Sequence, residues 1–445
     1  MTLPSFFRSF LVAAGMFVVA ASLTHAQTET PPPNILLVIA DDMGLDVSPC
    51  YDLGGEKPVM PVLEAMCRDG LVFDNVWAEP VCSPTRATIL TGRYGFRTGV
   101  LQPAGGMAGG GIRLDELSLQ RFLDENAPAP YAHAVIGKWH LSDSTNGDRD
   151  NPELMGVGFY SGLIAGGVRD YYRFELTSGG VSETVDGYAT TVFTDIAIDW
   201  LSRQQVPWFL WLAYNAPHTP FHVPPAGLHH RDLIDTAAAI EADPRPYYLA
   251  ALEALDSEMG RLLDSLDPAT RENTIVIFLG DNGTPNQVAE TPYTPSTVKG
   301  TLYPGGIAVP MVVSGAGVTR KGEREAAPVN TADLFATIAD LAGVAATPAE
   351  DSISFRPLLS ASAVGDRSQL YSDLQATQPP PMARNSGWTI REGPYQLLML
   401  DDGARLLFDV EADPGGATNL LDAGGDAEAI AARLEAAGRT LRGDP

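Results

Sequence analysis

The sequence is poor in cysteine and in basic residues, and it contains no internal repeat. Three cysteines in 445 residues exclude a small disulfide-stabilised scaffold. With 29 Lys and Arg against 55 Asp and Glu, the net charge is −26. Such a chain repels polyanions on average, so nucleic acid is excluded as the main partner. The lack of repeats argues against a structural surface protein, and the length allows a large buried core.

Long apolar runs are also scarce, and the one that stands out, Phe10–Leu23, lies near the N-terminus. Arg8 precedes it, and Thr24-His25-Ala26 follows it, directly before Gln27. This order is typical of a cleaved signal peptide, and the run is short for a membrane span. We therefore expect residues 1–26 to be a signal peptide. The mature protein is then exported, periplasmic or secreted, and contains no membrane segment.

Shorter apolar runs alternate with helix-like segments along most of the chain. Runs that are apolar throughout are typical of strands buried on both faces. The expected strands are Asn34–Ala40, Ala132–Ile136, Trp208–Tyr214, Thr274–Leu279 and Val309–Ser314. The expected helices are Pro61–Asp69, Asp115–Asn126, Tyr188–Arg203, Tyr247–Leu266 and Ala332–Ala342. The alternation predicts an α/β fold with a large, mostly parallel or mixed sheet sandwiched by helices.

The pattern changes from about Ala361 onward. Three short segments separated by turn residues read as antiparallel strands, and an amphipathic helix, Asp426–Leu441, follows them. The three segments are Trp388–Arg391, Tyr395–Leu400 and Arg405–Val410. We therefore predict a main domain over residues 27–360 and a small C-terminal α+β subdomain over residues 361–445.

The segment Cys82–Arg93 begins with the order Cys-x-Pro-x-Arg. Ser83 is a good N-cap and Pro84 suits the first helical position, so a helix is expected to start here and to end at Gly92. Cys82 would then precede a helix N-terminus, where free N–H groups favour an anionic group.

Arg86 lies about one turn further on and can reach back toward Cys82. The alternative reading is that a lone cysteine is a buried, inert hydrophobe. The other motifs must decide between these two readings.

Acidic and amide side chains follow two of the predicted strands. Asp41 and Asp42 come directly after Asn34–Ala40, and Asp281 and Asn282 follow Thr274–Leu279. Taken alone, such a pair is more often a turn or a cap. Two oxygen-rich strand ends in one sheet, with no His or Cys beside them, indicate a site for Ca²⁺ or Mg²⁺ rather than Zn²⁺.

Basic and imidazole side chains stand at comparable places. Lys138 and His140 follow the strand Ala132–Ile136, and His218 follows Trp208–Tyr214. Lys299 lies in a Gly-rich segment. Each residue alone could be a surface lysine or a loop histidine. Together they predict a local basic pocket, which an anionic substrate would need in so acidic a chain.

These motifs together resemble the signature of the formylglycine-dependent sulfatases, which have an alkaline-phosphatase-like fold. The resemblance covers nearly all of the mature chain. It implies that a maturation enzyme oxidises Cys82 to Cα-formylglycine and that the substrate is a sulfated small molecule or oligosaccharide. The resemblance also implies that Asp41, Asp42, Asp281 and Asn282 bind a divalent cation, commonly Ca²⁺ and less often Mg²⁺.

The remaining roles follow from the same resemblance. Lys138 and Lys299 would hold the sulfate oxygens, and His140 would contact the hydrated formylglycine. His218 would donate a proton to the leaving oxygen or bind the sulfate. One hydroxyl of the hydrated aldehyde attacks sulfur, and the other then loses its proton as sulfate is expelled, which a serine or cysteine could not do. The expected reaction is hydrolysis of a carbohydrate or aryl sulfate.

Two other functions remain open from the sequence. A phosphonate monoester or phosphodiester hydrolase would share the formylglycine and the fold. An inactive homologue that binds sulfated glycans would share the ligand residues without turnover. The leaving alcohol is set by loops such as Ala104–Gly111, Leu141–Pro152 and Phe221–Pro246.

Two segments depart from the family pattern: Pro304 stands where an acid is usual, and Leu45-Asp46-Val47 replaces a commoner motif. His222 and His229-His230 match no motif and belong either to the substrate rim or to the plain surface. If Cys82 is oxidised, Cys50 and Cys67 remain, and both a disulfide and two free thiols are compatible with the sequence.

Overall fold

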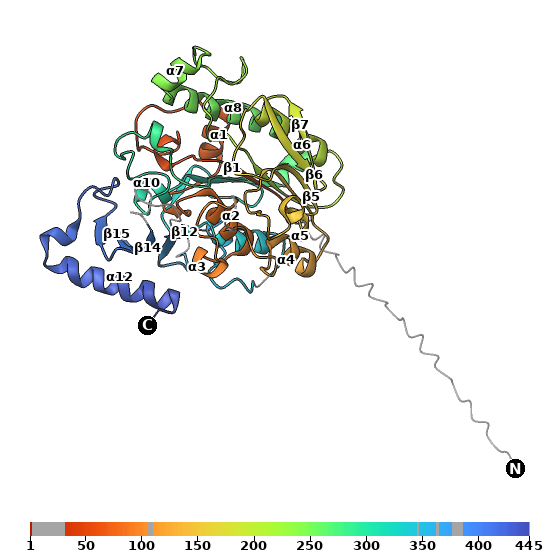
Figure 1. The fold of residues 1–445 in the computed structure, drawn as a ribbon. Coiled ribbons are helices and arrows are strands. Elements are labelled where there is room, and N and C mark those ends of the chain that lie inside the picture. Colours follow the sequence, from red (N-terminus) through yellow and green to blue (C-terminus); the bar gives the residue numbers. More distant parts are fainter. Residues whose placement is uncertain (2–31, 106–109, 345–346, 362–364, 376–385, 445) are drawn as a thin grey trace. The chain divides into compact units, whose positions relative to one another are not determined.

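The computed structural model describes Met1 and residues 32–105, 110–344, 347–361, 365–375 and 386–444. Ten strands form one mixed sheet in the order β11-β2-β10-β9-β1-β8-β4-β5-β6-β7 (Figure 1). The strands are β1 (Asn34–Ala40), β2 (Leu71–Phe73), β4 (Ala132–Lys138), β5 (Phe159–Leu163), β6 (Arg173–Ser178), β7 (Val181–Asp186), β8 (Trp208–Ala213), β9 (Thr274–Gly280), β10 (Met311–Gly315) and β11 (Glu323–Glu325). A separate pair consists of β3 (Val76–Trp77) and β12 (Val329–Asn330).

Five neighbouring strands, β9-β1-β8-β4-β5, run parallel and form the centre of the sheet. The register pairs Leu36 of β1 with Leu210 of β8 and with Val276 of β9. Because the strands are parallel, their carboxyl ends share one edge, where ligands of such sheets usually bind. Strand β10 runs antiparallel to β9 and to β2, which makes the whole sheet mixed.

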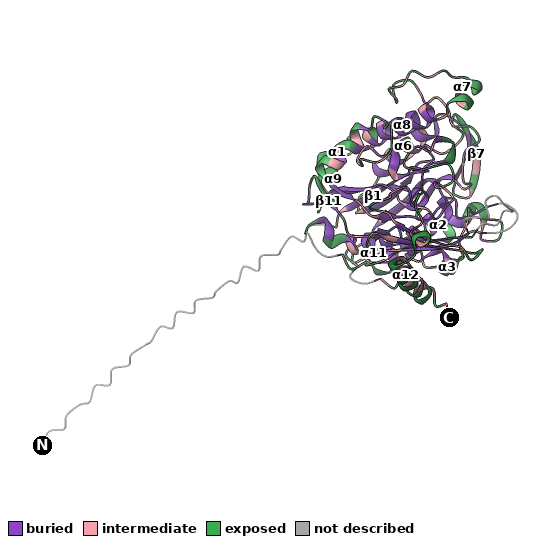
Figure 2. Cartoon of the chain, turned by 90° about the vertical axis from the view of Figure 1, so that its left-hand side faces the viewer, coloured by how far each residue is buried: buried purple, intermediate pink, exposed green. Residues whose placement is uncertain are grey.

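Helices cover both faces of the sheet, as the apolar runs predict. Ile35, Leu37 and Ile39 of β1 pack with one set of helices, and the intervening Leu36 and Val38 pack with the other. One face carries α2 (Cys82–Thr91), α4 (Leu119–Asn126) and α11 (Asp333–Leu341). The other face carries α1 (Pro61–Asp69), α6 (Ala189–Leu201) and α8 (Arg245–Asp264). Strand β1 is therefore buried on both sides (Figure 2).

Helix α4 starts four residues later than the sequence indicates. The expected helix begins at Asp115, whereas the hydroxyl of Ser118 accepts a hydrogen bond from the Arg121 N–H, at 3.2 Å, and caps a helix that begins at Leu119. A serine side chain at this position accepts a hydrogen bond from a backbone N–H that has no partner within the helix. It therefore marks the start of the helix.

The C-terminal region forms a four-stranded antiparallel sheet in the order β13-β14-β15-β16. Its elements are β13 (Leu370–Leu374), β14 (Gly387–Glu392), β15 (Tyr395–Leu400), β16 (Arg405–Asp409) and the helix α12 (Asp426–Arg442). Trp388, Leu397 and Leu434 are buried between α12 and the sheet. A Cβ at Gly438 would lie closer to the Trp388 ring than the 3.0 Å that real Cβ atoms keep, so glycine allows this packing. The proposed boundary at residue 360 stays a prediction.

Cys50 and Cys67 form a disulfide, with their Cα atoms 6.2 Å apart, and Cys67 lies on α1. This resolves the question that the sequence left open. The expected signal peptide lies outside the described residues, apart from Met1. Within the part of the chain that the structure describes, no helix combines the length and the apolar character that crossing a bilayer requires.

Candidate active site

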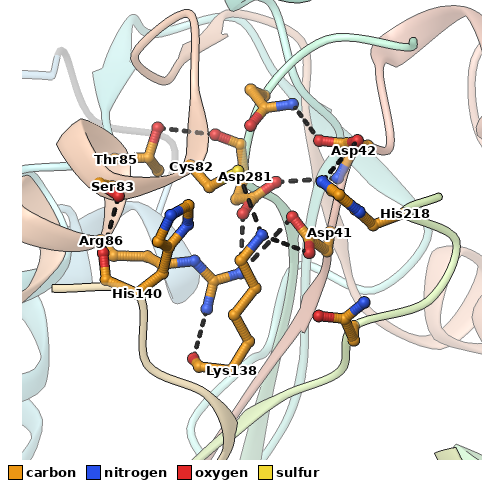
Figure 3. Close-up of polar contacts among 12 residues, drawn as sticks. Asp41, Asp42, Cys82, Ser83, Thr85, Arg86, Lys138, His140, His218 and Asp281 are labelled. Carbon is orange, nitrogen blue, oxygen red and sulfur yellow. Dashed lines mark hydrogen bonds and ion pairs between the residues drawn. The ribbon is translucent and has the colours of Figure 1, made fainter. Parts of the chain in front are cut away.

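Four adjacent strands end at one edge of the sheet, and polar side chains follow each of them (Figure 3). Asp41 and Asp42 follow β1, and Asp281 follows β9. Lys138 is the last residue of β4, and His218 lies in the loop after β8. In Figure 3 these side chains point toward one another and toward Cys82. The parallel arrangement thus assembles one site from four separate segments.

Helix α2 supplies Cys82 as its first residue, and its N-cap is Val81. The expectation that Ser83 caps this helix is wrong. The Ser83 hydroxyl instead donates a hydrogen bond to the carbonyl of His140, at 2.7 Å, and accepts one from the N–H of Ala104, at 2.8 Å. Serine at this position therefore connects the start of α2 to two loops that border the site.

Lys138 is the cation nearest to the cysteine. Its Nζ lies 3.2 Å from Cys82 Sγ and 2.6 Å from Asp41 Oδ2. The guanidinium of Arg86 lies 2.8 Å from Asp281 Oδ2 and 3.8 Å from Asp41 Oδ1. The side chains of Lys138, Arg86, Asp41 and Asp281 are fully buried. The two cations therefore hold two carboxylates directly beside the sulfur.

Asp42 is the centre of the other half of the site. Its carboxylate lies 2.6 Å from Lys299 Nζ, accepts a hydrogen bond of 2.8 Å from Asn282 Nδ2, and lies 3.8 Å from His218 Nε2. Its backbone N–H donates to Asp281 Oδ1, at 2.9 Å. The backbone of Asp42 has a φ of 72°, a left-handed conformation that aspartate tolerates better than most residues. This turn directs both aspartates of the pair into the site.

The oxygen atoms of this cluster suit a hard divalent cation. Asp41 Oδ1 and Asn282 Oδ1 are buried and accept no hydrogen bond from any residue that the structure describes. One ligand atom each of Asp41, Asp281 and Cys82 lies within 4.8 Å of the other two. Buried oxygens without a donor are costly unless a ligand satisfies them, and carboxylate and amide oxygens are the ligands that Ca²⁺ prefers. The residues present therefore fit the expected metal.

The charges of the site balance among the described residues. The three carboxylates are those of Asp41, Asp42 and Asp281, and the three cations are Lys138, Lys299 and Arg86. Adding a divalent cation leaves the cluster positive. A site of this kind attracts an anionic group despite the overall charge of −26.

Burial and charge shift the pKa values of these groups in different directions. Burial raises the pKa of Asp41 to about 7, although Lys138 opposes the shift. For Asp42, the effect of burial is outweighed by Lys299 and His218, which hold its pKa well below the usual range. Burial raises the pKa of the Cys82 thiol to about 12, against the effect of Lys138. The unmodified thiol is thus protonated near neutral pH.

Burial disfavours the charged form of both histidines of the site. Burial lowers the pKa of His218 to about 4, although Asp42 favours the charged form. Burial also lowers the pKa of His140, and Lys138 adds to the effect. His140 Nε2 lies 3.0 Å from the carbonyl of Ala104, and its Nδ1 has no hydrogen-bond partner within the described part of the chain. That nitrogen is available to a ligand.

Comparison with known proteins identifies the family. The family model for sulfatases matches residues 33–344. The chain belongs to the sulfatase family. This sulfatase is 27% identical to arylsulfatase G of Mus musculus over 376 residues, which is 72% of this chain and 67% of the relative. It is 28% identical to N-acetylgalactosamine-6-sulfatase of Canis lupus familiaris over 397 residues, covering 80% of this chain and 71% of the relative. The protein is therefore a sulfuric ester hydrolase.

Solved structures agree with this fold. The crystal structure of Ps i-CgsB in complex with k-i-k-neocarrahexaose has a TM-score of 0.75 and 23% identity, over 92% of this chain and 93% of that one. The phosphonate monoester hydrolase of Agrobacterium radiobacter has a TM-score of 0.68 and 19% identity, over 92% of this chain and 95% of that one. At these identities the likeness concerns the fold alone.

The two departures from the family pattern leave the ligand residues of this sulfatase in place. Pro304 is the first residue of α10 (Pro304–Ile307). At this position the backbone N–H that proline lacks would have no partner within the helix. The loop before it still brings Lys299 to Asp42. Asp46 is buried, and its carboxylate accepts a hydrogen bond of 2.6 Å from Thr284 Oγ1.

Sequence reasoning did not single out several residues that position the site. The Thr85 hydroxyl donates to the carbonyl of Asp281, at 2.7 Å, and the Tyr248 hydroxyl donates to the carbonyl of Asp42, at 2.9 Å. Thr85 lies inside the Cys-x-Pro-x-Arg motif, so its place in the sequence could have identified it as a residue of the site. Tyr248 lies in the first turn of α8, and no local pattern distinguishes it.

The three unassigned histidines have different surroundings. His222 stacks on the ring of Tyr171, with centroids 3.9 Å apart, and its Nε2 lies 3.2 Å from the Tyr188 hydroxyl. His229 accepts a hydrogen bond from the N–H of Arg231, and His230 Nδ1 lies 3.7 Å from Glu253. His222 therefore belongs to an aromatic cluster near His218, and the other two lie in a separate ionic network.

Proposed function

We propose that this sulfatase hydrolyses a sulfate ester with residue 82, oxidised to formylglycine, as nucleophile and with Ca²⁺ bound beside it. The observation that carries the proposal is the position of Cys82 Sγ, 3.2 Å from Lys138 Nζ, at the edge where Asp41 and Asp281 converge. The sulfur stands where a hydroxyl oxygen of the hydrated formylglycine would lie. A side chain at this place faces cations and oxygen ligands together.

The metal ligands are Asp41, Asp42, Asp281 and Asn282 in this proposal. Asp41 and Asp281 cluster with Cys82, while Asp42 is joined to Asp281 through its backbone N–H and to Asn282 through the Asn282 amide. In the described chain, Asp41 Oδ1 and Asn282 Oδ1 accept no hydrogen bond. When bound, the cation neutralises charge around the sulfate and polarises the oxygen of the nucleophile. Ca²⁺ suits this set better than Zn²⁺ because every donor is a hard oxygen.

The cations and histidines have separate roles. Lys138 and Lys299 hold the sulfate oxygens and stabilise the charge that spreads over them during transfer. Arg86 holds Asp281 and Asp41 in place through its ion pairs. His140 contacts residue 82 from the loop after β4. His218 faces the leaving oxygen and donates a proton to it from the charged form of the imidazole, which Asp42, 3.8 Å from Nε2, favours. Nδ1 of the same ring donates to the Thr219 carbonyl, at 2.7 Å.

The substrate class and the processing of the chain belong to the same proposal. One relative is an N-acetylgalactosamine-6-sulfatase, and one solved neighbour holds a neocarrahexaose. We infer a carbohydrate sulfate as substrate. The N-terminal sequence supports export to the periplasm or beyond, after a maturation enzyme has oxidised Cys82.

Release of inorganic sulfate from a panel of substrates tests this function. The panel contains nitrophenyl sulfate, sulfated oligosaccharides and a phenyl phosphonate ester. The proposal predicts sulfate release from at least one sulfate ester and its loss in Asp281→Asn, which keeps the side-chain size. Faster cleavage of the phosphonate ester would make the protein a phosphonate monoester hydrolase. Binding of oligosaccharides without any release would make it a glycan-binding homologue.

A further inference from the structure

The segment after β5 passes directly over the two histidines of the site. A Cβ at Gly166 would lie closer to His140 Cε1 than the 3.0 Å that real Cβ atoms keep. A Cβ at Gly167 would lie 3.3 Å from His218 Cε1. The two glycines therefore let the backbone approach both imidazole rings, so this segment lies directly against the site.

Hydrogen bonds fix this segment to the loop that carries His218. The Tyr171 hydroxyl lies 2.7 Å from the carbonyl of Asn215 and 2.7 Å from the carbonyl of His218. The Tyr172 hydroxyl donates to the carbonyl of Val223, at 2.6 Å. The backbone between Gly167 and Tyr171 is thus held in a set position, which is the condition for a built subsite.

Arg169 lies on this fixed stretch. It is exposed and, among the residues that the structure describes, makes no ion pair and no side-chain hydrogen bond. Two residues span at most about 7 Å, so its Cα lies within that distance of Gly167. The cations inside the site are different, because Lys138, Arg86 and Lys299 are all paired with carboxylates.

An unpaired arginine at this place has a specific use. The chain carries a net charge of −26, which repels an anionic substrate as it approaches. A guanidinium without a carboxylate partner keeps its donors free for a sulfate or carboxylate, which it binds through two parallel hydrogen bonds. An uncharged leaving group has no anion for this guanidinium to bind.

We propose that Arg169 forms a subsite for a second anionic group of the substrate, next to the sulfate that is cleaved. The preferred substrate is then an oligosaccharide with at least two anionic groups, and Arg169 determines that preference. The inference rests on the proposed function, because it places the cleaved sulfate beside residue 82.

The test compares Arg169→Gln with a matched control, Arg271→Gln. Arg271 is also an exposed arginine without a side-chain partner in the described chain, but it lies on α9 (Pro268–Glu272), before the start of β9 and at the opposite edge of the sheet. Both variants lower the net charge by one. We expect Arg169→Gln to reduce kcat/KM about tenfold on an oligosaccharide with two sulfates, mainly through KM, and less than threefold on nitrophenyl sulfate. Arg169→Lys should restore part of the loss.

These measurements can contradict the role of Arg169 without contradicting the proposed hydrolysis of a sulfate ester. Oligosaccharides whose second group is a sulfate or a carboxylate show which anion the subsite prefers. Equal losses on the oligosaccharide and the aryl sulfate, or no loss on the oligosaccharide, would overturn the role of Arg169. Calorimetric binding of the disulfated oligosaccharide to Cys82→Ala, with and without Arg169→Gln, gives a readout that needs no turnover. A tenfold weaker affinity there supports the subsite even if sulfate release fails.

Discussion

Lys138 Nζ lies 2.6 Å from Asp41 Oδ2, and both side chains are fully buried. An isolated charge at either position would be costly, so each residue requires the other or an equivalent partner. The same lysine lies 3.2 Å from Cys82 Sγ. One ammonium group therefore connects the stability of the site to its chemistry.

Replacing Lys138 with methionine tests this connection. The variant should lose about 3–5 kcal/mol of unfolding free energy when a chelator is present, because Asp41 is left without its partner. It should also lose about 100- to 1000-fold in kcat, as expected when a fixed cation is removed from a transferring group. Denaturant unfolding and sulfate release measure the two effects.

Lys321→Met is the control, because Lys321 is exposed and has no ion pair in the described chain. It should change neither quantity appreciably. A Lys138→Met variant with unchanged turnover would show that the ammonium does not hold the sulfate.

Chelation should stop turnover without unfolding the protein. The carboxylates of the site already pair with Lys138, Arg86 and Lys299, so the fold does not depend on the metal for charge balance. Calcium at about 100 times its dissociation constant should add about 2.7 kcal/mol, seen as a rise of a few degrees in Tm. Differential scanning calorimetry with EDTA and with added calcium measures this shift.

Asp281→Asn should abolish the calcium-dependent part of the shift while the variant stays folded. An equal rise in Tm with calcium in the variant would place the metal elsewhere on this acidic chain.

Gly166→Ala should disable the site through sterics alone. The new Cβ would occupy the position of the His140 ring, so the imidazole or the backbone must move. A misplacement of about 1 Å costs on the order of 100-fold in rate. Gly167→Ala is the milder comparison, since its Cβ would lie 3.3 Å from His218. Kinetics of both variants test the contact, and equal rates would contradict it.

The Cys50–Cys67 disulfide should stabilise the fold and leave the chemistry unchanged. It closes a loop with a sequence separation of 17 residues. A cross-link of this length lowers the entropy of the unfolded chain and so stabilises the fold by about 3 kcal/mol. The double variant Cys50→Ala/Cys67→Ala should lower the unfolding free energy by about that amount and keep kcat. A loss of turnover at temperatures where the variant is folded would mean that α1 helps to position the site.

The strand ends of the site were predictable because of their local pattern. Asn34–Ala40 is apolar throughout, and Asp41 and Asp42 interrupt it abruptly, so the position of the pair at the end of β1 follows from the sequence. Gly92 likewise ends α2 with a φ of 67°, as expected for a glycine at a helix C-terminus.

Other features depend on contacts that no local pattern records. The N-cap of α2 is Val81 rather than Ser83, because the Ser83 hydroxyl is used by the carbonyl of His140. The strands β6 and β7 pair as an exposed hairpin at the end of the sheet, and their polar residues give a weak strand signal. Nothing in the local sequence singles out Gly166 and Gly167, which the fold places against His140 and His218.

The central claim is that residue 82 acts as an oxidised cysteine. Mass spectrometry of the tryptic peptide covering residues 69–86, made on preparations of differing specific activity, tests it most directly. The account predicts a peptide in which the thiol has been replaced by an aldehyde, in a fraction that rises in proportion to sulfate release. A fully active preparation in which this peptide carries only the unmodified thiol of Cys82 would contradict it.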